Sequence, residues 1–176
     1  MTLPAYDAAD PTAYVESRLA LVEGQDPIAL LEAAPGRVAR ALEGVTEKDA
    51  RRPEADGAWS ILEVVRHLAD SEIVYGYRLR LIASADRPEI VGYDQETWAE
   101  TLKYHRGTVA DAHGDYASAR RSTVRFLTSL PGAAWDRVGL HSERGEESIR
   151  RIVALLAAHD IGHGQQIERV RSVLDV

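Results

Sequence analysis

The stretch LLAAHDIGHGQQIERV (residues 155–170) places two histidines four residues apart in a segment that otherwise has the apolar spacing of an amphipathic helix. Residues i and i+4 are neighbours on a helix surface, with Cβ atoms about 6 Å apart. His159 and His163 can therefore direct their rings at one shared object. Both occupy the middle of the apolar stripe, so we expect them to face the protein interior. A metal ion is the first ligand that this pattern indicates.

The whole-chain composition limits what such a site could serve. A chain of 176 residues with 45% hydrophobic content is long enough for one domain with a sizeable core. The formal charge of −7 and the lack of a basic cluster argue against a nucleic-acid partner. No apolar run approaches membrane length and the N-terminus has no signal-peptide pattern, so we expect a cytoplasmic protein without a membrane partner. Because the chain has no Cys, a metal must be held by His, Asp or Glu.

Helical spacing of apolar residues recurs along most of the chain. Ser60 and Glu63 have the spacing of a capping box, which predicts a helix from about residue 61 to Ser84. Pro35 lies inside an earlier apolar stripe and should kink or split that helix. The pattern predicts an all-α fold, a bundle of four main helices preceded by a short N-terminal helix. The bundle helices are expected at about 26–44, 61–84, 108–130 and 147–174.

The connections between these helices are expected to contain no strand. The long connection after residue 84 should hold one short helix in residues 95–104. Residues 131–145 are rich in Pro and Gly and are expected to form a loop. Glu146 and Glu147 suit the positive end of the last helix dipole. Residues 1–25 are taken as an N-terminal extension with a short helix, and residues 26–176 as the bundle.

A third histidine extends the candidate site. His67 lies on the edge of the apolar stripe of the second bundle helix. If that helix packs antiparallel to the last one, with His67 opposite the His159–His163 pair, the two helices overlap along their whole lengths. A parallel arrangement would leave apolar turns uncovered. We therefore predict His67, His159 and His163 as metal ligands, and we expect His141, about 20 Å away along the chain, to lie outside the site.

Three imidazoles without a fourth protein ligand describe an open coordination sphere, which is typical of catalytic rather than structural zinc. Asp-Ile-Gly separates His159 from His163, so the His-Glu-x-x-His motif of metalloproteases and its general base are missing. The expected cofactor is one divalent metal ion. Imidazole suits Zn and Ni best, and Fe and Mn are the alternatives.

Three further residues near these histidines have two interpretations each. Glu72 lies within the apolar stripe of the second bundle helix, where it could orient a ligand histidine or pair with an arginine. Gly162 and Gly164 flank His163 inside a helix, and each costs about 1 kcal/mol relative to Ala. Such a local violation marks either a functional site or a close helix crossing, and the sequence favours neither.

Three segments of the chain together resemble the DinB superfamily of metalloenzyme-like proteins over roughly residues 26–174. They are GAWSILEVVRHLADSE, YDQETWAETLKY and HSERGEESIRRIVALLAAHDIGHGQQIERVRSVL. The residues that match the family pattern are Trp59, Ser60, His67, His159, His163 and Gln166. The resemblance implies a bundle in up-down-down-up order with a long crossover between helices 2 and 3. It also implies a divalent metal on the three histidines and a homodimer.

The resemblance leaves the reaction open, because the family includes thiol transferases that use bacillithiol, mycothiol or glutathione. One interpretation is a metal-dependent enzyme that activates a low-molecular-weight thiol as an S-transferase, or water as a hydrolase, on a small substrate. Ser71, Arg78 and Gln166 would then line the pocket, and the sequence assigns no catalytic residue beyond the ligands. The alternative is a non-catalytic, metal-stabilised dimeric interaction domain. A polar, accessible cavity would favour the enzyme.

Overall fold

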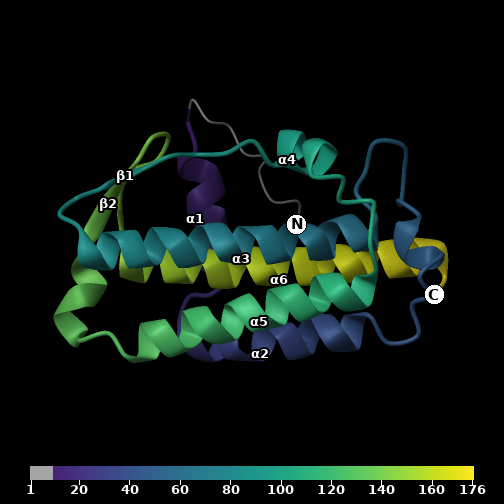
Figure 1. The fold of residues 1–176 in the computed structure, drawn as a ribbon, viewed down its shortest axis with the longest axis horizontal. Helices are drawn as coiled ribbons and strands as arrows, with labels where there is room; N and C mark the ends of the chain where they lie inside the picture. Colours follow the sequence, from purple (N-terminus) through teal and green to yellow (C-terminus); the bar gives the residue numbers. More distant parts are fainter. Residues whose placement is uncertain (1–9) are drawn as a thin grey trace.

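Four long helices form the body of the molecule in a computed structural model that describes residues 10–176. They are α2 (Pro27–Ala41), α3 (Ile61–Ser84), α5 (Val109–Thr128) and α6 (Ile149–Leu174). Helices α2 and α6 run in one direction and α3 and α5 in the other (Figure 1). The predicted four-helix bundle in up-down-down-up order is therefore confirmed. Because α3 and α5 are parallel, the chain between them must return along the length of the bundle.

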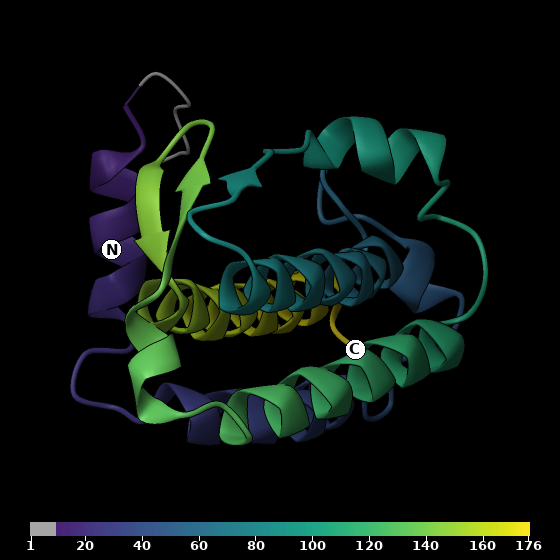
Figure 2. The ribbon, with the colours of Figure 1, turned by 60° about the vertical axis from the view of Figure 1, so that its left-hand side comes forward.

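That returning crossover carries β1 (Glu89–Ile90) and α4 (Gln95–Thr101). Strand β1 pairs in parallel with β2 (Val138–His141), which pairs antiparallel with β3 (Gly145–Ser148). Figure 2 shows this small sheet and α4 on the same side of the bundle. The expectations of no strand and of a loop over residues 131–145 are wrong. Strands of two to four residues are too short to show an alternating pattern, and the parallel pairing joins segments about 50 residues apart.

The sheet packs closely on the end of α3 because Gly139 has no side chain. A Cβ atom at this position would lie 2.8 Å from Cγ1 of Ile90 and 2.9 Å from Cγ1 of Ile82. Glu147 is buried in β3 and pairs with Arg144, so the predicted helix-dipole role is wrong for Glu147. Helix α6 begins two residues later, where the Ser148 side chain accepts a hydrogen bond from the Arg151 amide.

The predicted capping box at the start of α3 is confirmed. The Ser60 side chain accepts from the Glu63 amide, and Glu63 Oε2 accepts from the Ser60 amide at 2.8 Å. The N-terminal helix α1 (Thr12–Ala20) packs against α6. Short 3₁₀ segments, η1 (Asp49–Arg51) and η2 (Gly132–Asp136), complete the fold. No helix within residues 10–176 combines the length and apolar character needed to cross a bilayer.

Helix α2 continues through Pro35, so the expected split is not found. Proline has no amide hydrogen, which leaves the carbonyl of Leu31, four residues earlier, without its helical partner. Nη1 of Arg120 on α5 donates to this carbonyl at 3.3 Å. The Pro35 carbonyl also has a partner on α5, because it lies 2.9 Å from Nε2 of His113. A neighbouring helix thus satisfies the backbone groups that the proline affects.

Arg120 also binds two buried carboxylates on the remaining helices. Its Nε donates to Oε2 of Glu72 on α3 at 2.7 Å, and its Nη2 donates to Oδ1 of Asp160 on α6 at 3.2 Å. Of the two interpretations of Glu72, pairing with an arginine is correct. Burial by itself would raise the pKa of Asp160, but the charge and hydrogen bonds of Arg120 and a contribution from His159 outweigh it and lower that pKa to about 2.

This polar network separates two apolar clusters. One cluster includes Val38, Leu68, Tyr116 and Ile167, and the other includes Leu79, Leu127, Ile152 and Leu156. Each of the four helices contributes one residue to the network, namely Leu31, Glu72, Arg120 or Asp160. Along each helix, this residue lies between the two clusters or at the boundary between them. The bundle therefore has an ionic layer at mid-height and an apolar core on each side of it.

We predict that Arg120→Met lowers the free energy of unfolding by about 3–5 kcal/mol, because it leaves two buried carboxylates without their counter-charge. Urea denaturation followed by circular dichroism would measure the change. The matched control is Arg121→Met, which alters an exposed side chain on the same helix and should change stability by about 0.5 kcal/mol or less. A loss below about 1 kcal/mol for Arg120→Met would contradict the structural role of the network.

Candidate metal centre

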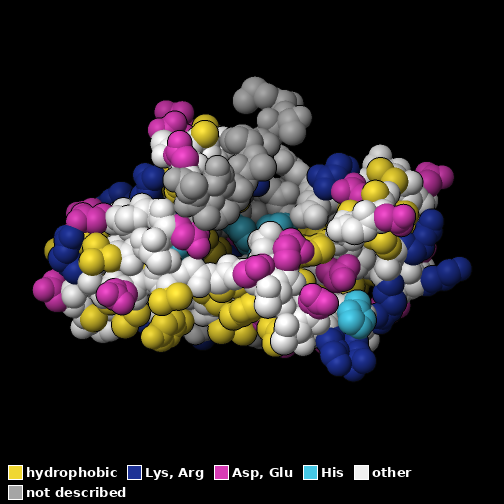
Figure 3. Space-filling model, turned by 90° about the horizontal axis from the view of Figure 1, so that it is seen from above, with side chains coloured by type: hydrophobic (Ala, Val, Ile, Leu, Met, Phe, Trp, Pro, Cys, Tyr) yellow, Lys and Arg dark blue, Asp and Glu magenta, His cyan; other side chains and the backbone are white. Residues whose placement is uncertain are grey.

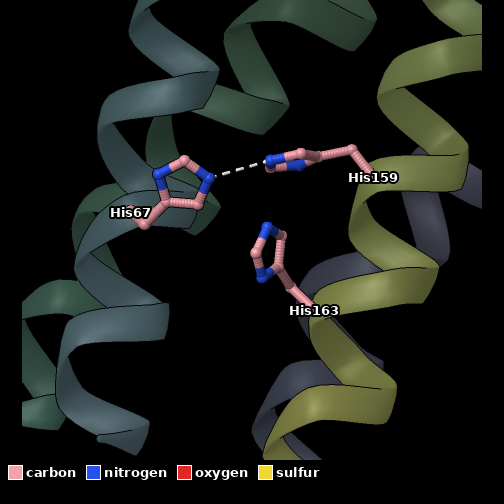
Figure 4. Close-up of side chains that lie close together, drawn as sticks. All are labelled: His67, His159 and His163. Carbon is pink, nitrogen blue, oxygen red and sulfur yellow. Dashed lines mark hydrogen bonds between the residues drawn. The ribbon is translucent and has the colours of Figure 1, made fainter. Parts of the chain in front are cut away.

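The three predicted ligand histidines converge on one point between α3 and α6 (Figure 4). One ring nitrogen from each of His67, His159 and His163 lies within 4.8 Å of the other two. Nε2 of His67 is 3.0 Å from Nε2 of His159. Within residues 10–176 this is the only group of three or more His, Cys, Asp or Glu side chains with such geometry, and His141 is outside it.

The cluster is open to solvent on one side. In Figure 3, histidine side chains are visible at the bottom of a hollow on the face that carries the sheet and α4. His67 is buried, whereas the side chain of His159 keeps 17% of its surface exposed. A small molecule could therefore approach the imidazoles through this hollow.

The surroundings keep the imidazoles of His67 and His163 uncharged. Burial, and then the neighbouring histidines, hold the pKa of His67 well below its usual value. Burial and the nearby His159 lower the pKa of His163 to about 3. At neutral pH both rings are neutral, so each has a nitrogen lone pair available to a metal ion.

Neighbouring side chains fix the orientation of two of the rings. Oε1 of Gln166 lies 2.8 Å from Nδ1 of His163, and because an amide oxygen can only accept, Nδ1 carries the proton and Nε2 is bare. Oγ of Ser71 lies 3.3 Å from Nε2 of His67 and 3.0 Å from the hydroxyl of Tyr93. Gln166 and Ser71, both predicted to line a pocket, thus contact the histidines directly.

Two aromatic side chains complete the surroundings of His67. The ring of Trp59, a residue of the family pattern, lies 4.9 Å from the His67 ring. Tyr93 comes from the crossover and stacks on Trp98 of α4 at 4.5 Å. The sequence did not identify Tyr93, because nothing in a connecting segment shows which helix it will cover.

The arrangement fits a divalent cation. Three nitrogens about 2.1 Å from a tetrahedral zinc ion would lie about 3.4 Å apart, close to the spacing found between His67 and His159. Nδ1 of His67 and Nδ1 of His159 are buried without a hydrogen-bond partner. Hydrogen bonding within the protein therefore leaves one nitrogen of each of these two rings unsatisfied.

The two glycines that flank His163 have different surroundings. A Cβ atom at Gly162 would lie 2.6 Å from Nη1 of Arg18, so this glycine allows the guanidinium group of α1 to approach α6. At Gly164 a Cβ atom would meet nothing within 4 Å. Among residues 10–176, the atoms nearest to Gly162 belong to the Arg18 side chain and not to the backbone of another helix, so a close helix crossing is not found, and no packing contact requires Gly164.

Comparison with known proteins adds relatives that share this fold. The model of the DinB superfamily matches residues 30–167, which include all three histidines. The chain belongs to the DinB superfamily. Over 149 residues, 81% of this chain and 82% of the relative, it is 36% identical to "Putative metal-dependent hydrolase YfiT" of Bacillus subtilis. It is 29% identical over 145 residues, 82% and 83% of the two chains, to a protein of Bacillus mycoides with the same description.

A solved structure has the same fold as this DinB-superfamily chain. YfiT from Bacillus subtilis, described as "a probable metal-dependent hydrolase with an unusual four-helix bundle topology", superposes with a TM-score of 0.80. The superposition covers 99% of this chain and 95% of YfiT, with 19% sequence identity. Helix α1 lies outside the part that the family model matches, so Arg18 is not part of the shared motif.

The two glycines should respond differently to alanine. Gly164→Ala fills open space within a helix and should raise the free energy of unfolding by about 0.5–1 kcal/mol. Gly162→Ala should gain less or lose stability, because the new methyl group displaces Arg18. Parallel urea denaturation of both variants measures the difference. Equal gains at the two positions would show that Arg18 does not pack closely against α6.

Proposed function

We propose that this DinB-superfamily chain is a divalent-metal-dependent hydrolase of a small molecule, with His67, His159 and His163 as the metal ligands. The observation that carries the proposal is the convergence of three imidazoles, two of them held neutral by burial, at the bottom of an open hollow. No fourth His, Cys, Asp or Glu of residues 10–176 joins the cluster, which leaves room for water or substrate. The descriptions of the relatives support the same reaction class.

The side chains around the cluster have definable roles in this proposal. Gln166 holds the proton of His163 on Nδ1 and keeps Nε2 free to ligate. The hydroxyls of Ser71 and Tyr93 form a polar pair beside His67, where they can donate hydrogen bonds to a substrate oxygen. A bound divalent ion would supply Lewis acidity and lower the pKa of water.

The same site supports transfer of a thiol as a second candidate reaction. The carboxylate beside the cluster is that of Asp160, whose Oδ1 lies 3.8 Å from Nδ1 of His159, and its pKa of about 2 makes it a weak base for deprotonating water. A thiol, with a pKa of about 8.5, loses its proton far more readily than water does. Because the chain has no Cys, the sulfur would come from an external low-molecular-weight thiol.

The non-catalytic interpretation requires a metal site that is closed to solvent and serves only to stabilise the fold. The accessible hollow above the histidines argues for the enzyme instead. The homodimer stays a prediction from the family resemblance.

Metal content tests the ligand assignment. The protein should contain about one divalent ion per chain, with Zn or Ni expected first, and His67→Ala and His159→Ala should each lose most of it. Elemental analysis of folded samples measures this, with His105→Ala, an exposed histidine, as the control. Removal of the ion with a chelator should lower Tm, because the ion binds only the folded chain. Full metal retention in both variants would contradict the assignment.

The reaction can be tested on metal-loaded protein with chromogenic esters, and separately with a chromogenic aryl chloride plus glutathione, bacillithiol or mycothiol. A hydrolase should release product from an ester without thiol, and a transferase should require one. His159→Ala should lose the activity and His105→Ala should keep it. If neither reaction exceeds the His159→Ala background, the non-catalytic interpretation gains support.

A further inference from the structure

Arg78, an arginine near the histidine hollow, is buried and forms no ion pair within residues 10–176. His67, Ser71, Tyr75 and Arg78 follow one another at steps of four, four and three residues on α3, so they form a single stripe along that helix. The stripe leads from the histidine cluster toward the small sheet. The Tyr75 ring lies 6.2 Å from the ring of His159, and Arg78 stands over Tyr75 at 5.6 Å.

Arg78 is only 6% exposed, yet it forms no ion pair with any Asp or Glu of residues 10–176. Its Nη2 donates one hydrogen bond of 2.5 Å to the carbonyl of Val91. The guanidinium group also lies 5.9 Å from the ring of Tyr93. A guanidinium group has five N–H donors, and buried arginines are normally paired. Arg120 follows that rule with two carboxylates, whereas Arg78 does not.

The charged groups near Arg78 do not neutralise it. The carboxylate of Glu147 is held by Arg144 through contacts of 2.8 and 2.9 Å. The imidazole of His141 is also buried nearby, and its Nε2 has no hydrogen-bond partner. The charged groups around Arg78 and His141 are thus Arg144, Glu147 and Glu143, and neither carboxylate forms an ion pair with Arg78 among those within residues 10–176. Arg18 adds a second cation beside His163.

The cover over Arg78 is thin. Val91, whose carbonyl accepts the hydrogen bond, is 74% exposed, and Tyr93 follows it in the same extended segment of the crossover. The hydroxyl of Tyr93 is bonded to Ser71, which contacts His67. Ser71, Tyr75 and Tyr93 thus form the layer of side chains that lies between Arg78 and the histidines.

We propose that Arg78 binds an anionic group, a carboxylate or a phosphate, of the small molecule that occupies the histidine hollow. Identifying this anion with the substrate rests on the proposed function, but the binding itself does not require the metal ion. An oxyanion would supply the counter-charge that Arg78 lacks, and a planar guanidinium group can bind either anion with two parallel hydrogen bonds.

Calorimetric titration of the full chain with benzoate and phenyl phosphate tests the proposal, with neutral benzamide for comparison. We expect saturable binding of at least one anion and binding of benzamide that is weaker by about tenfold or more. Arg78→Gln should reduce anion affinity by about tenfold or more, and Arg121→Gln should not. Unchanged affinity in Arg78→Gln, or no saturable binding to the wild-type chain, would overturn the proposal. The tighter of the two anions identifies the group that the site prefers.

Two further experiments distinguish this inference from its alternatives. Titrations before and after chelation distinguish Arg78 from the metal ion, because binding to Arg78 should persist in chelated protein. A lack of hydrolase activity in metal-loaded protein, together with retained Arg78-dependent binding, would reject only the proposed function. Arg78→Met should leave the urea midpoint unchanged or higher, since it removes a buried unpaired charge. A fall in midpoint as large as that of Arg120→Met would show that Arg78 is a structural cation and would overturn the anion site.

Discussion

The guanidinium group of Arg120 is the contact on which the bundle depends, because it touches all three other long helices at once. From α5 it binds Glu72 on α3, Asp160 on α6 and the carbonyl of Leu31 on α2. Hydrophobic contacts in the two apolar clusters above and below are not directional, so they specify the register of the helices less sharply than hydrogen bonds do. A buried ionic layer with fixed donor directions specifies one register of the four helices.

That register also positions the candidate metal centre. Asp160, which anchors α6 to Arg120, directly follows the candidate ligand His159 in the sequence. On α3, Glu72 lies five residues after His67 and holds that helix to the same guanidinium group. A shift of either helix by one turn, about 5.4 Å, would separate His67 from the other two histidines.

The long crossover between α3 and α5 gives the site its walls. A bundle with short connections would leave α3 and α6 exposed at the level of the histidines. Here the connection supplies Tyr93 and the carbonyl of Val91, and α4 supports Tyr93 through Trp98. The sheet holds one end of the crossover in place by pairing β1 with β2. The helix order thus shapes the candidate site, because two parallel helices require a long connecting segment, and here that segment supplies Tyr93 and the Val91 carbonyl.

The sequence by itself determined the helices, the bundle and the three histidines, because each of these depends on local spacing. The Ser60–Glu63 cap and the four-residue step from His159 to His163 are contained within one or two helical turns. Antiparallel packing of α3 on α6 followed from the overlap of two apolar stripes. The match to the DinB superfamily rests on the same short patterns.

Only the tertiary structure decided the features that join distant segments. It paired Glu72 with Arg120, kept α2 continuous through Pro35, and placed Tyr93 beside the histidine cluster. It also formed a sheet from strands too short to recognise, and it buried Arg78 without a carboxylate partner from residues 10–176. In each case the partner lies on another element of the chain, and a periodic pattern specifies which face of a helix is buried but not which polar group will meet it there.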